Sequence, residues 1–161
     1  MVDTRTPEQR RRIMRSVSRK DTGPERTLRS ALHAAGIRGW RCDYRSAPGR
    51  PDLAWPALRV AVFVDGAFWH GHPSRHEPGR SGGYWDEKIA GNVARDRRVD
   101  AELRATGWEV TRVWDFEVAK ALPAVIDRII TVLTERVSEE PGPRWQRGLA
   151  CRSSVPPCAL A

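Results

Sequence analysis

The sequence predicts an α/β domain in which helices flank a small central mixed sheet. The predicted elements follow one another as two helices, three strands, a helix, a strand and a helix, an order typical of this fold class. A β-branched run at 59–64 is long enough for a buried central strand. The length of 161 residues suits one domain with its own core. We divide the chain into a basic N-terminal helical arm (1–20), the domain (21–137) and a C-terminal tail (138–161) that is predicted to be disordered.

Two capping-box patterns mark the predicted helices of the N-terminal third. Thr6 and Gln9 have the spacing at which each side chain satisfies a backbone N–H at a helix start, and this helix carries the basic arm. Thr22 and Glu25 repeat the spacing, and Gly36 is the predicted end of the second helix. From the residues alone, Glu25 is interpreted as a first-turn acid that the helix dipole stabilises.

Three strands are predicted to follow, separated by segments rich in Gly and Pro. A turn at 56–57 joins the second strand to the third, which ends at Asp65. Gly49 and Arg50, in the loop before the second strand, would let the backbone and a guanidinium approach a phosphate. The predicted strands span 40–45, 53–55 and 59–64.

The C-terminal half is predicted to contain a long helix, a strand and a second helix, after a loop at 71–83. Asn92 and Asp96 are four residues apart in the long helix, so both side chains could point into one site. The alternative is a solvated, salt-bridged helix face. Pro123 either bends the last helix or lies in its first turn. The predicted elements span 84–106, 108–114 and 117–137.

The excess positive charge of the chain lies at its N-terminal end. Residues 1–50 hold 13 Lys and Arg against 5 Asp and Glu, whereas residues 51–161 hold 15 of each. A basic segment beside a pair of carboxylates indicates a polyanionic substrate, and we favour nucleic acid over a merely soluble basic surface. In the functional interpretation of the arm, Arg15, Arg19 and Lys20 contact the phosphate backbone; the alternative is a surface helix.

Cysteine usage and hydropathy argue against a secreted or membrane protein. The three cysteines form neither a disulfide framework nor a CxxC pattern, which indicates a reducing cytoplasm. No apolar run approaches the ~20 residues needed to cross a bilayer, and no signal peptide opens the chain. We therefore expect a cytoplasmic protein with no membrane partner.

Two carboxylates and a histidine lie where a metal-dependent site could form. Asp52 precedes the second strand and Asp65 ends the third, so we expect their side chains to be neighbours at one edge of the sheet. A hard divalent cation there would offset their repulsion. His70 follows five residues after Asp65 and could deprotonate a water. The alternative for His70 is a core histidine bonded to a backbone carbonyl.

Four stretches of the chain resemble the very short patch repair (Vsr) endonucleases. They are RRIMRSVSRKDTGPE, PGRPDL…VFVDGAFWHGH, YWDEKIAGNVARDRR and GWEVTRVWDFE, and the similarity covers roughly residues 8 to 120 in the right order and spacing. These bacterial enzymes nick DNA beside the T:G mismatches that deamination of 5-methylcytosine leaves. The resemblance implies the same activity here.

The resemblance also implies a restriction-endonuclease-like fold of the PD-(D/E)xK type, although this chain lacks the usual lysine after the second acid. Asp52, together with Asp65 and the Val64 carbonyl, is expected to hold one or two Mg²⁺ ions that bind the scissile phosphate. His70 then serves as the base or positions the water. The residues assigned to catalysis are Asp52, Asp65, His70, Asp96 and Glu25.

An aromatic wedge is the second implied feature. In the Vsr family, the residues that correspond to Phe68, Trp69 and Trp85 enter the base stack beside the mismatch, where unstacking costs least because the pairing is already faulty. The alternative is ordinary core packing, chiefly for Trp85. The other residues assigned to DNA binding are Arg15, Arg19, Lys20, Arg50 and Asn92.

The chain departs from the family pattern at two places. Val64 and Asp65 stand where many members have Thr-His, so Asp65 is expected to take over as a metal ligand. The structural zinc site of the family is expected to be lost, because one histidine cannot hold a tetrahedral ion. The four positions that correspond to zinc ligands are Ala67, His72, Ser74 and Phe116.

These observations lead to one main hypothesis and two alternatives. The main hypothesis is a Mg²⁺-dependent, strand-specific nicking endonuclease, acting as a monomer at T:G mismatches in double-stranded DNA, with mismatch-repair proteins as candidate partners at the bacterial nucleoid. The first alternative is a restriction-type nicking enzyme that cuts unmismatched sites. The second is a mismatch-binding module with feeble cleavage.

Overall fold

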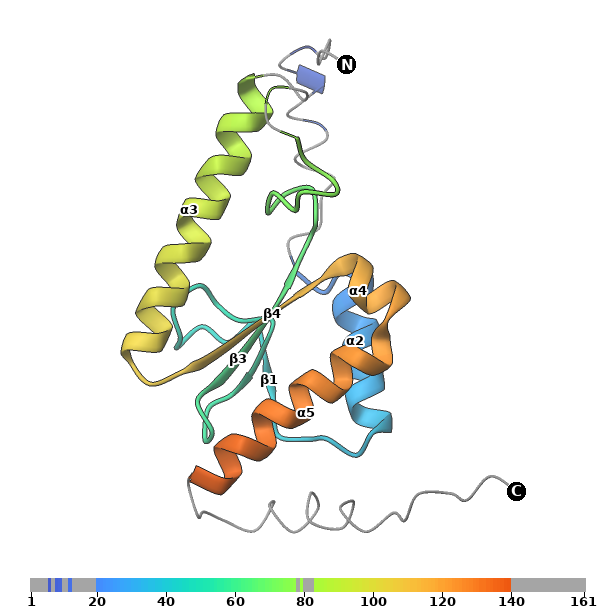
Figure 1. Ribbon diagram of the computed structural model, residues 1–161, viewed down its shortest axis with the longest axis vertical. Coiled ribbons are helices and arrows are strands. Elements are labelled where there is room, and N and C mark those ends of the chain that lie inside the picture. Colours follow the sequence, from blue (N-terminus) through green and yellow to red (C-terminus); the bar gives the residue numbers. More distant parts are fainter. Residues whose placement is uncertain are drawn as a thin grey trace, which may run out of the picture.

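A mixed four-stranded sheet forms the centre of the described part of the chain, as predicted (Figure 1). The computed structural model describes residues 20–77, 79 and 83–139, together with Thr6, Glu8, Gln9 and Arg12. The strands lie in the order β1-β2-β3-β4, and all neighbours are antiparallel except the parallel pair of β3 and β4. Their bounds are β1 (Arg41–Cys42), β2 (Leu53–Trp55), β3 (Val60–Asp65) and β4 (Glu109–Trp114).

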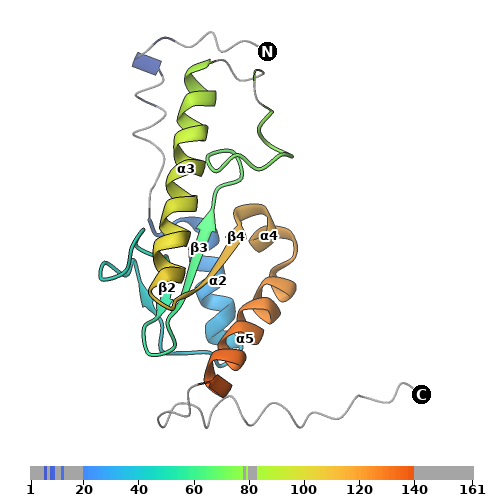
Figure 2. The same cartoon turned by 60° about the vertical axis from the view of Figure 1, so that its left-hand side comes forward.

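Helices cover both faces of the sheet, with α3 on one side and α2, α4 and α5 on the other (Figures 1 and 2). Successive side chains of β3 point to opposite faces of the sheet, which explains this arrangement. Val60 and Val62 are buried in a core cluster with α2 and α5, whereas Ala61 and Phe63 are buried in a second cluster with α3. The helices are α2 (Gly23–Ala34), α3 (Gly83–Ala105), α4 (Asp115–Lys120) and α5 (Leu122–Glu139).

The capping box predicted at Thr6 is confirmed, whereas at Thr22 only the cap by the threonine side chain is, because Glu25 accepts from the N–H of Asp21 and not from that of Thr22. The backbone N–H of Thr6 donates to Oε1 of Gln9 at 2.9 Å, and the N–H of Gln9 donates to Oγ1 of Thr6 at 3.3 Å. At α2, the N–H of Glu25 donates to Oγ1 of Thr22 at 3.5 Å, and Glu25 accepts from the N–H of Asp21 at 2.8 Å. The side chains therefore satisfy donors that a helix start leaves without partners.

The first predicted strand is shorter than expected. We predicted a strand at 40–45, but β1 contains only Arg41 and Cys42. Asp43 has a φ of 47°, in the left-handed region, so the chain leaves the extended conformation there. The bounds of β2 and β4 match the predictions closely, and β3 begins and ends one residue later than predicted.

The last predicted helix is two helices. We predicted one helix at 117–137, but α4 ends at Lys120 and α5 begins at Leu122, with Ala121 (φ −137°, ψ 36°) between them. Pro123 lacks a backbone N–H and so cannot continue a helix from the preceding turn, but it fits the first turn of α5. Ser138 and Glu139, which we placed in a disordered tail, belong to α5. The remainder of that predicted tail lies outside the described residues.

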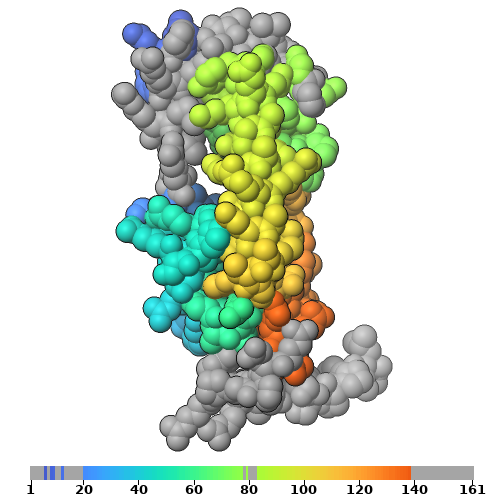
Figure 3. Space-filling model, turned by 90° about the vertical axis from the view of Figure 1, so that its left-hand side faces the viewer, coloured from blue at the N-terminus to red at the C-terminus, as the bar shows by residue number. Residues whose placement is uncertain are grey.

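Helix α3 and the loop before β2 lie against each other and frame one edge of the sheet. Figure 3 shows α3 along one face, with the segment near residues 40–50 beside its lower half. Gly49 is required at this contact, because a Cβ there would lie 2.4 Å from Cγ1 of Val99 and its φ is +71°. None of the helices in the described part of the chain is long and apolar enough to span a membrane.

Candidate active site

The site forms where β3 and β4 end together beside α3. Because the two strands are parallel, with Asp65 paired to Trp114, both strands end at the same edge of the sheet. Phe63 and Val110 both belong to the α3-side core cluster, so Asp65 and Arg112, two residues further along each strand, face α3 as well. Asp96 and Asp100 meet them from α3 one helical turn apart.

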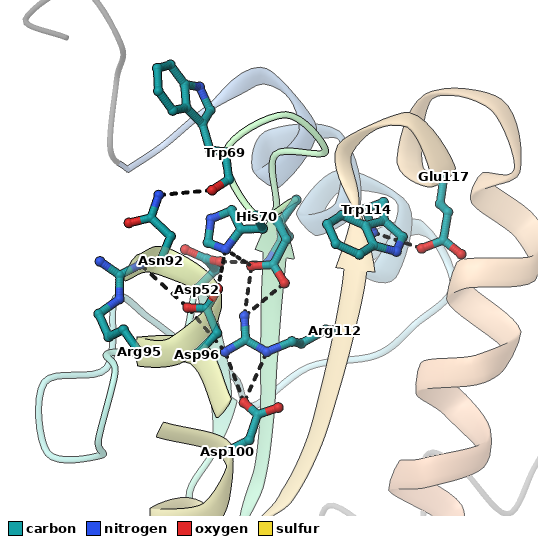
Figure 4. A network of polar contacts seen from close by, with 12 residues as sticks. Asp52, Trp69, His70, Asn92, Arg95, Asp96, Asp100, Arg112, Trp114 and Glu117 are labelled. Atoms are coloured by element: carbon teal, nitrogen blue, oxygen red, sulfur yellow. Dashed lines mark hydrogen bonds and ion pairs between the residues drawn. The ribbon is translucent and has the colours of Figure 1, made fainter. Parts of the chain in front are cut away.

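Arg112 is the centre of a network of charged side chains (Figure 4). Its Nη1 donates to both carboxylate oxygens of Asp65, at 2.9 and 2.8 Å. Its Nε and Nη2 lie 3.0 and 2.9 Å from Oδ1 of Asp100, and Nη2 lies 3.7 Å from Oδ1 of Asp96. Burial lowers the pKa of Arg112, but the bond to Asp100 and the charge of Asp65 outweigh it, so the pKa is raised. The guanidinium therefore stays charged.

His70 is held by two carboxylates on one side of its ring. Its Nδ1 lies 2.5 Å from Oδ2 of Asp96 and 3.5 Å from Oδ1 of Asp65. Burial lowers the pKa of His70, but the hydrogen bond to Asp96 and the charges of both acids raise it more. Burial raises the pKa of Asp96, but its bond to His70 together with the charges of His70, Arg112 and Arg95 outweighs burial, so its pKa is lowered. An ionised Asp96 can only accept, so Nδ1 carries the proton and Nε2 of a neutral ring is free to act as a base.

Asp52 is a buried carboxylate in surroundings that disfavour its charge. Its Oδ2 accepts from the backbone N–H of Val64 at 2.7 Å. Burial, followed by the charges of Glu25, Asp65 and Asp43, raises its pKa to about 7, against the lowering effect of the Val64 bond. Such a group gains from a nearby cation, so the surroundings of Asp52 fit a Mg²⁺ ligand.

Protein ligands alone would not fill the coordination shell of such an ion. Among the described residues, no group of three or more His, Cys, Asp or Glu side chains is arranged to hold a metal. Mg²⁺ usually keeps several waters and takes one or two carboxylates together with phosphate oxygens, which agrees with a sparse site. Both oxygens of Asp65 accept from Arg112. The expected role of Asp65 as a metal ligand, with the Val64 carbonyl, therefore stays a prediction.

Glu25 has a structural role that is visible in its contacts. One of its oxygens accepts from the hydroxyl of Thr22 and the other from the N–H of Asp21, each at 2.8 Å. It is 7% exposed, and its charge contributes to the raised pKa of Asp52. The capping role is thus confirmed, and Glu25 also lies within electrostatic reach of the acidic site.

The predicted wedge residues form one aromatic group. The ring centroids of Phe68 and Trp69 are 5.1 Å apart, and Trp85 lies 6.2 Å from Phe68 and 5.6 Å from Trp69. Phe68 and Trp69 are half-buried, whereas Trp85 is only 4% exposed. The indole of Trp69 points away from the charged network in Figure 4, and its carbonyl accepts from Nδ2 of Asn92 at 2.9 Å. Asn92 therefore fixes the backbone of the turn that carries Trp69.

Only some of the arginines and lysines predicted to bind DNA lie within the described residues. Arg50 has a φ of 56°, and its Nη2 pairs with Oδ2 of Asp43 at 2.8 Å, which fixes this arginine in the loop that leads to Asp52. Lys20 is exposed. Arg15 and Arg19 lie outside the described residues, as does most of the predicted basic arm.

The positions of the family's zinc ligands hold an aromatic cluster. His72 lies with its ring 4.8 Å from that of Trp114 and 5.0 Å from that of Phe116, and its Nδ1 contacts Oγ of Ser74 at 2.8 Å. The N–H of Ala67, which is buried, donates to a carboxylate at the start of α4 at 3.2 Å. These contacts join the turn after β3 to the end of β4, and the expected absence of zinc stays a prediction.

Sequence reasoning missed Arg112 and Asp100. A usable signal was present, because Arg112 is a charged residue inside the predicted strand and lies two residues after Val110, on the same face. Asp100 follows Asp96 by four residues, on the helix face already assigned to the site. The contact of His76 with Asp86 was not predicted either; its Nε2 lies 2.9 Å from Oδ1 of Asp86, which anchors the loop after β3 to the start of α3.

Comparison with known proteins gives one consistent result. Residues 2–76 match the family described as DNA mismatch endonuclease Vsr. The chain is 44% identical over 121 residues to the type II nicking enzyme V.XorIIP of Xanthomonas oryzae pv. oryzae, covering 74% of this chain and 88% of that protein. It is 41% identical over 127 residues to the type II nicking enzyme V.NaeI of Lentzea aerocolonigenes, covering 74% and 76%. It is 35% identical over 141 residues to the DNA mismatch endonuclease Vsr of Escherichia coli, covering 86% and 87%.

Proposed function

Because this chain belongs to the Vsr family of DNA endonucleases, we propose that it nicks one strand of duplex DNA beside a T:G mismatch. The observation that carries the proposal is the pairing of His70 with Asp96 near Asp52, a carboxylate whose pKa is raised to about 7. Perturbed titratable groups that converge at the end of a sheet are typical of catalytic sites. The mixed sheet with helices on both faces supports the restriction-endonuclease-like fold that family membership implies.

In the proposed reaction, His70 is the general base. Asp96 holds Nδ1 of the ring, and Nε2 takes a proton from the attacking water. The imidazolium that results is stabilised by the negative charges of Asp96 and Asp65. Orientation by a carboxylate also fixes the tautomer of the neutral ring, so that Nε2 is the nitrogen that can accept a proton.

Asp52 and the Val64 carbonyl would hold Mg²⁺, with Asp65 as a further ligand only if it exchanges Arg112 for the ion. When bound, Mg²⁺ supplies positive charge that stabilises the reacting phosphate and the leaving oxygen. Asp52 contributes the charge that retains the cation, and the N–H of Val64 fixes the direction of that carboxylate.

Selectivity for the mismatch is proposed to come from the turn after β3. Phe68 and Trp69 are half-buried and lie edge to face, so they can leave their mutual contact and enter a base step. Trp85 is buried and serves as the support beneath them. Unstacking costs a few kcal/mol, least at a faulty pair, so the wedge favours T:G over matched DNA.

A nicking assay on end-labelled duplexes tests this function. The substrates are matched, T:G and other mismatched duplexes of one sequence, each with Mg²⁺ or EDTA, and the control enzyme is Asp52→Ala. We expect Mg²⁺-dependent cutting of one strand of the T:G duplex, lost in Asp52→Ala while DNA binding is retained. Equal cutting of the matched duplex would favour the restriction-type alternative. Tighter binding of T:G without cutting by the wild type would favour the binding module.

A further inference from the structure

We propose that Arg112 is a positioning residue of this endonuclease and that Asp65 acts through it. In this proposal Asp65 anchors the guanidinium, and the guanidinium sets Asp96 and α3 at the distance where Asp96 meets His70. The proposal rests on the proposed nicking reaction, since it concerns the same histidine. It gives Asp65 a role other than that of a metal ligand.

The donors of Arg112 are all directed at carboxylates. Arginine has five N–H groups in a planar fork. In Arg112, Nη1 donates twice to Asp65, at 2.9 and 2.8 Å, while Nε and Nη2 both approach one oxygen of Asp100, at 3.0 and 2.9 Å. Since each nitrogen already has a carboxylate partner, Arg112 acts on nicking through its neighbours and does not bind the DNA phosphate.

These contacts join three elements at the edge where the site forms. Arg112 comes from β4, Asp65 from β3, and Asp96 and Asp100 from α3. The guanidinium also lies over the ring of Phe63, with Cζ 4.5 Å from the ring centroid, which fixes its plane. The Arg112 side chain is 21% exposed, so the ion pairs are screened less than surface pairs are. Arg112 is thus the link between the strand edge and α3.

Asp96 has a different partner at each oxygen. Oδ2 lies 2.5 Å from Nδ1 of His70, while Oδ1 lies 3.5 Å from Nη2 of Arg95, the preceding residue of α3, and 3.7 Å from Nη2 of Arg112. Asp65 approaches His70 only to 3.5 Å, which is too long for a strong hydrogen bond. Asp65 and Asp96 thus both approach His70 and both pair with Arg112, so the guanidinium bridges the two acids that hold the ring. A lysine could not reproduce this link, because its single ammonium cannot bridge carboxylates on two sides as a fork does.

The test compares wild type with Arg112→Met, Arg112→Lys, Asp65→Asn and the double variant Asp65→Asn/Arg112→Met. The measurements are the single-turnover nicking rate on a T:G duplex in Mg²⁺ and the Kd for the same duplex in EDTA. Arg112→Met should lower the rate on the order of 10–100-fold with Kd unchanged, as expected for the loss of a residue that orients a catalytic side chain without touching the substrate. Arg112→Lys should recover little of that rate. Asp65→Asn should slow the wild type but add little to Arg112→Met, because the pair acts as one unit.

The matched control is Arg128→Met. Arg128 is a partly exposed arginine of α5 that pairs with Glu117 at 3.2 Å, on the face of the sheet opposite to α3. It also donates to the backbone carbonyl of Arg112 at 3.4 Å, so the control includes any effect of losing a contact with that backbone but leaves the guanidinium of Arg112 and its carboxylate partners in place. Its loss removes an arginine–carboxylate pair of the same kind but should leave the nicking rate unchanged. All rates are compared at a temperature where circular dichroism shows every variant to be folded, so a loss of stability cannot imitate a loss of positioning.

A second readout does not depend on cleavage. The ¹⁵N signals of the His70 imidazole, at a pH where the ring is neutral, should show the Nδ1–H tautomer in wild type and a mixture of tautomers in Arg112→Met. Unchanged tautomer signals together with an unchanged nicking rate would overturn the proposal. So would an equal rate loss from Asp65→Asn in both backgrounds with a higher Mg²⁺ requirement, which would make Asp65 a metal ligand. If wild type did not nick at all, the proposed function would fail, and the imidazole spectra would still decide the role of Arg112.

Discussion

At the scale of single residues, Asp52 departs furthest from the ordinary behaviour of its side chain. It accepts one backbone hydrogen bond from Val64, but burial and three neighbouring acids outweigh this and raise its pKa to about 7. The same surroundings that make its charge costly in the free protein favour a bound cation. Stability and metal binding are therefore linked at this one carboxylate.

Asp52→Asn should change how stability depends on pH. The pKa of Asp52 is higher in the folded state than the 3.8 of an ordinary aspartate, so its ionisation destabilises the fold. In wild type, the contribution that neutral Asp52 makes to the free energy of unfolding is therefore present at low pH and is lost as the pH rises toward and through about 7. The asparagine side chain keeps an acceptor for Val64 but cannot ionise. Between pH 5 and 8 without metal, we therefore expect the free energy of unfolding of the variant to exceed that of wild type by on the order of 2–4 kcal/mol.

The measurement is urea unfolding at pH 5, 6, 7 and 8 in EDTA, repeated with Mg²⁺. Added Mg²⁺ should raise the stability of wild type at pH 8 but not that of Asp52→Asn. Asp86→Asn is the control, because the hydrogen bond from His76 lowers the pKa of Asp86 from its ordinary 3.8, so Asp86 stays ionised from pH 5 to 8 and its curve should run parallel to that of wild type. Parallel curves for wild type and Asp52→Asn across this range would show that Asp52 ionises as it does in water.

At the scale of elements, the turn after β3 and the start of α3 work as one unit. Asn92 of α3 binds the carbonyl of Trp69, and His76 binds Asp86 at the first turn of the helix. The buried ring of Trp85 completes the contact. The turn can therefore present Phe68 and Trp69 on a rigid support, which a wedge requires because a flexible one would fold away from the bases.

Trp69→Ala and Trp85→Ala should separate recognition from stability. Trp85 is 4% exposed, so its replacement is expected to cost about 3–5 kcal/mol of unfolding free energy. Trp69 is half-buried, so its replacement should cost less but reduce the preference for T:G over matched duplex. Denaturant unfolding and competition binding measure the two effects. The control is Trp40→Ala, which removes a half-buried tryptophan beside Trp55 and should lower only the stability. If Trp69→Ala kept its preference for T:G over matched duplex, the wedge would be contradicted.

At the scale of the whole molecule, the charge distribution matches the position of the site. The net charge is +8, and all of this excess lies in residues 1–50. The catalytic edge is acidic, so DNA would be drawn by the basic segment and cut where carboxylates and a cation meet it. Such an arrangement predicts strong dependence of binding on salt.

Charge-removing variants of the basic segment test this arrangement. Each phosphate contact that is lost should make the slope of log K against log salt shallower by about 0.9. We therefore expect Arg12→Gln/Arg15→Gln to reduce the slope by about 2 on matched and T:G duplexes alike. Lys120→Gln/Arg128→Gln removes the same charge from α4 and α5 and serves as the control. Equal slopes for both double variants would show that the basic segment acts only through net charge.

Much of this architecture follows from local rules. Local spacing predicted the helix caps at Thr6 and Thr22, the strand that ends at Asp65 and the placement of Asn92 with Asp96. Each of these depends on neighbours no more than four residues away. The break at Ala121 depended on which of two positions Pro123 takes, and both were compatible with the pattern. Local spacing predicts elements well and their exact ends less well.

The sequence by itself determined the class of fold, the order of the elements and the carboxylates and histidine around which the site forms. Only the tertiary structure decided that Asp65 pairs with Arg112, that Trp85 is buried and that Asp100 joins the network. The reason is distance along the chain, since Asp65 and Arg112 are 47 residues apart. Pairing between strands so distant depends on which face each residue takes and on the helix packed against them, and no local pattern encodes that.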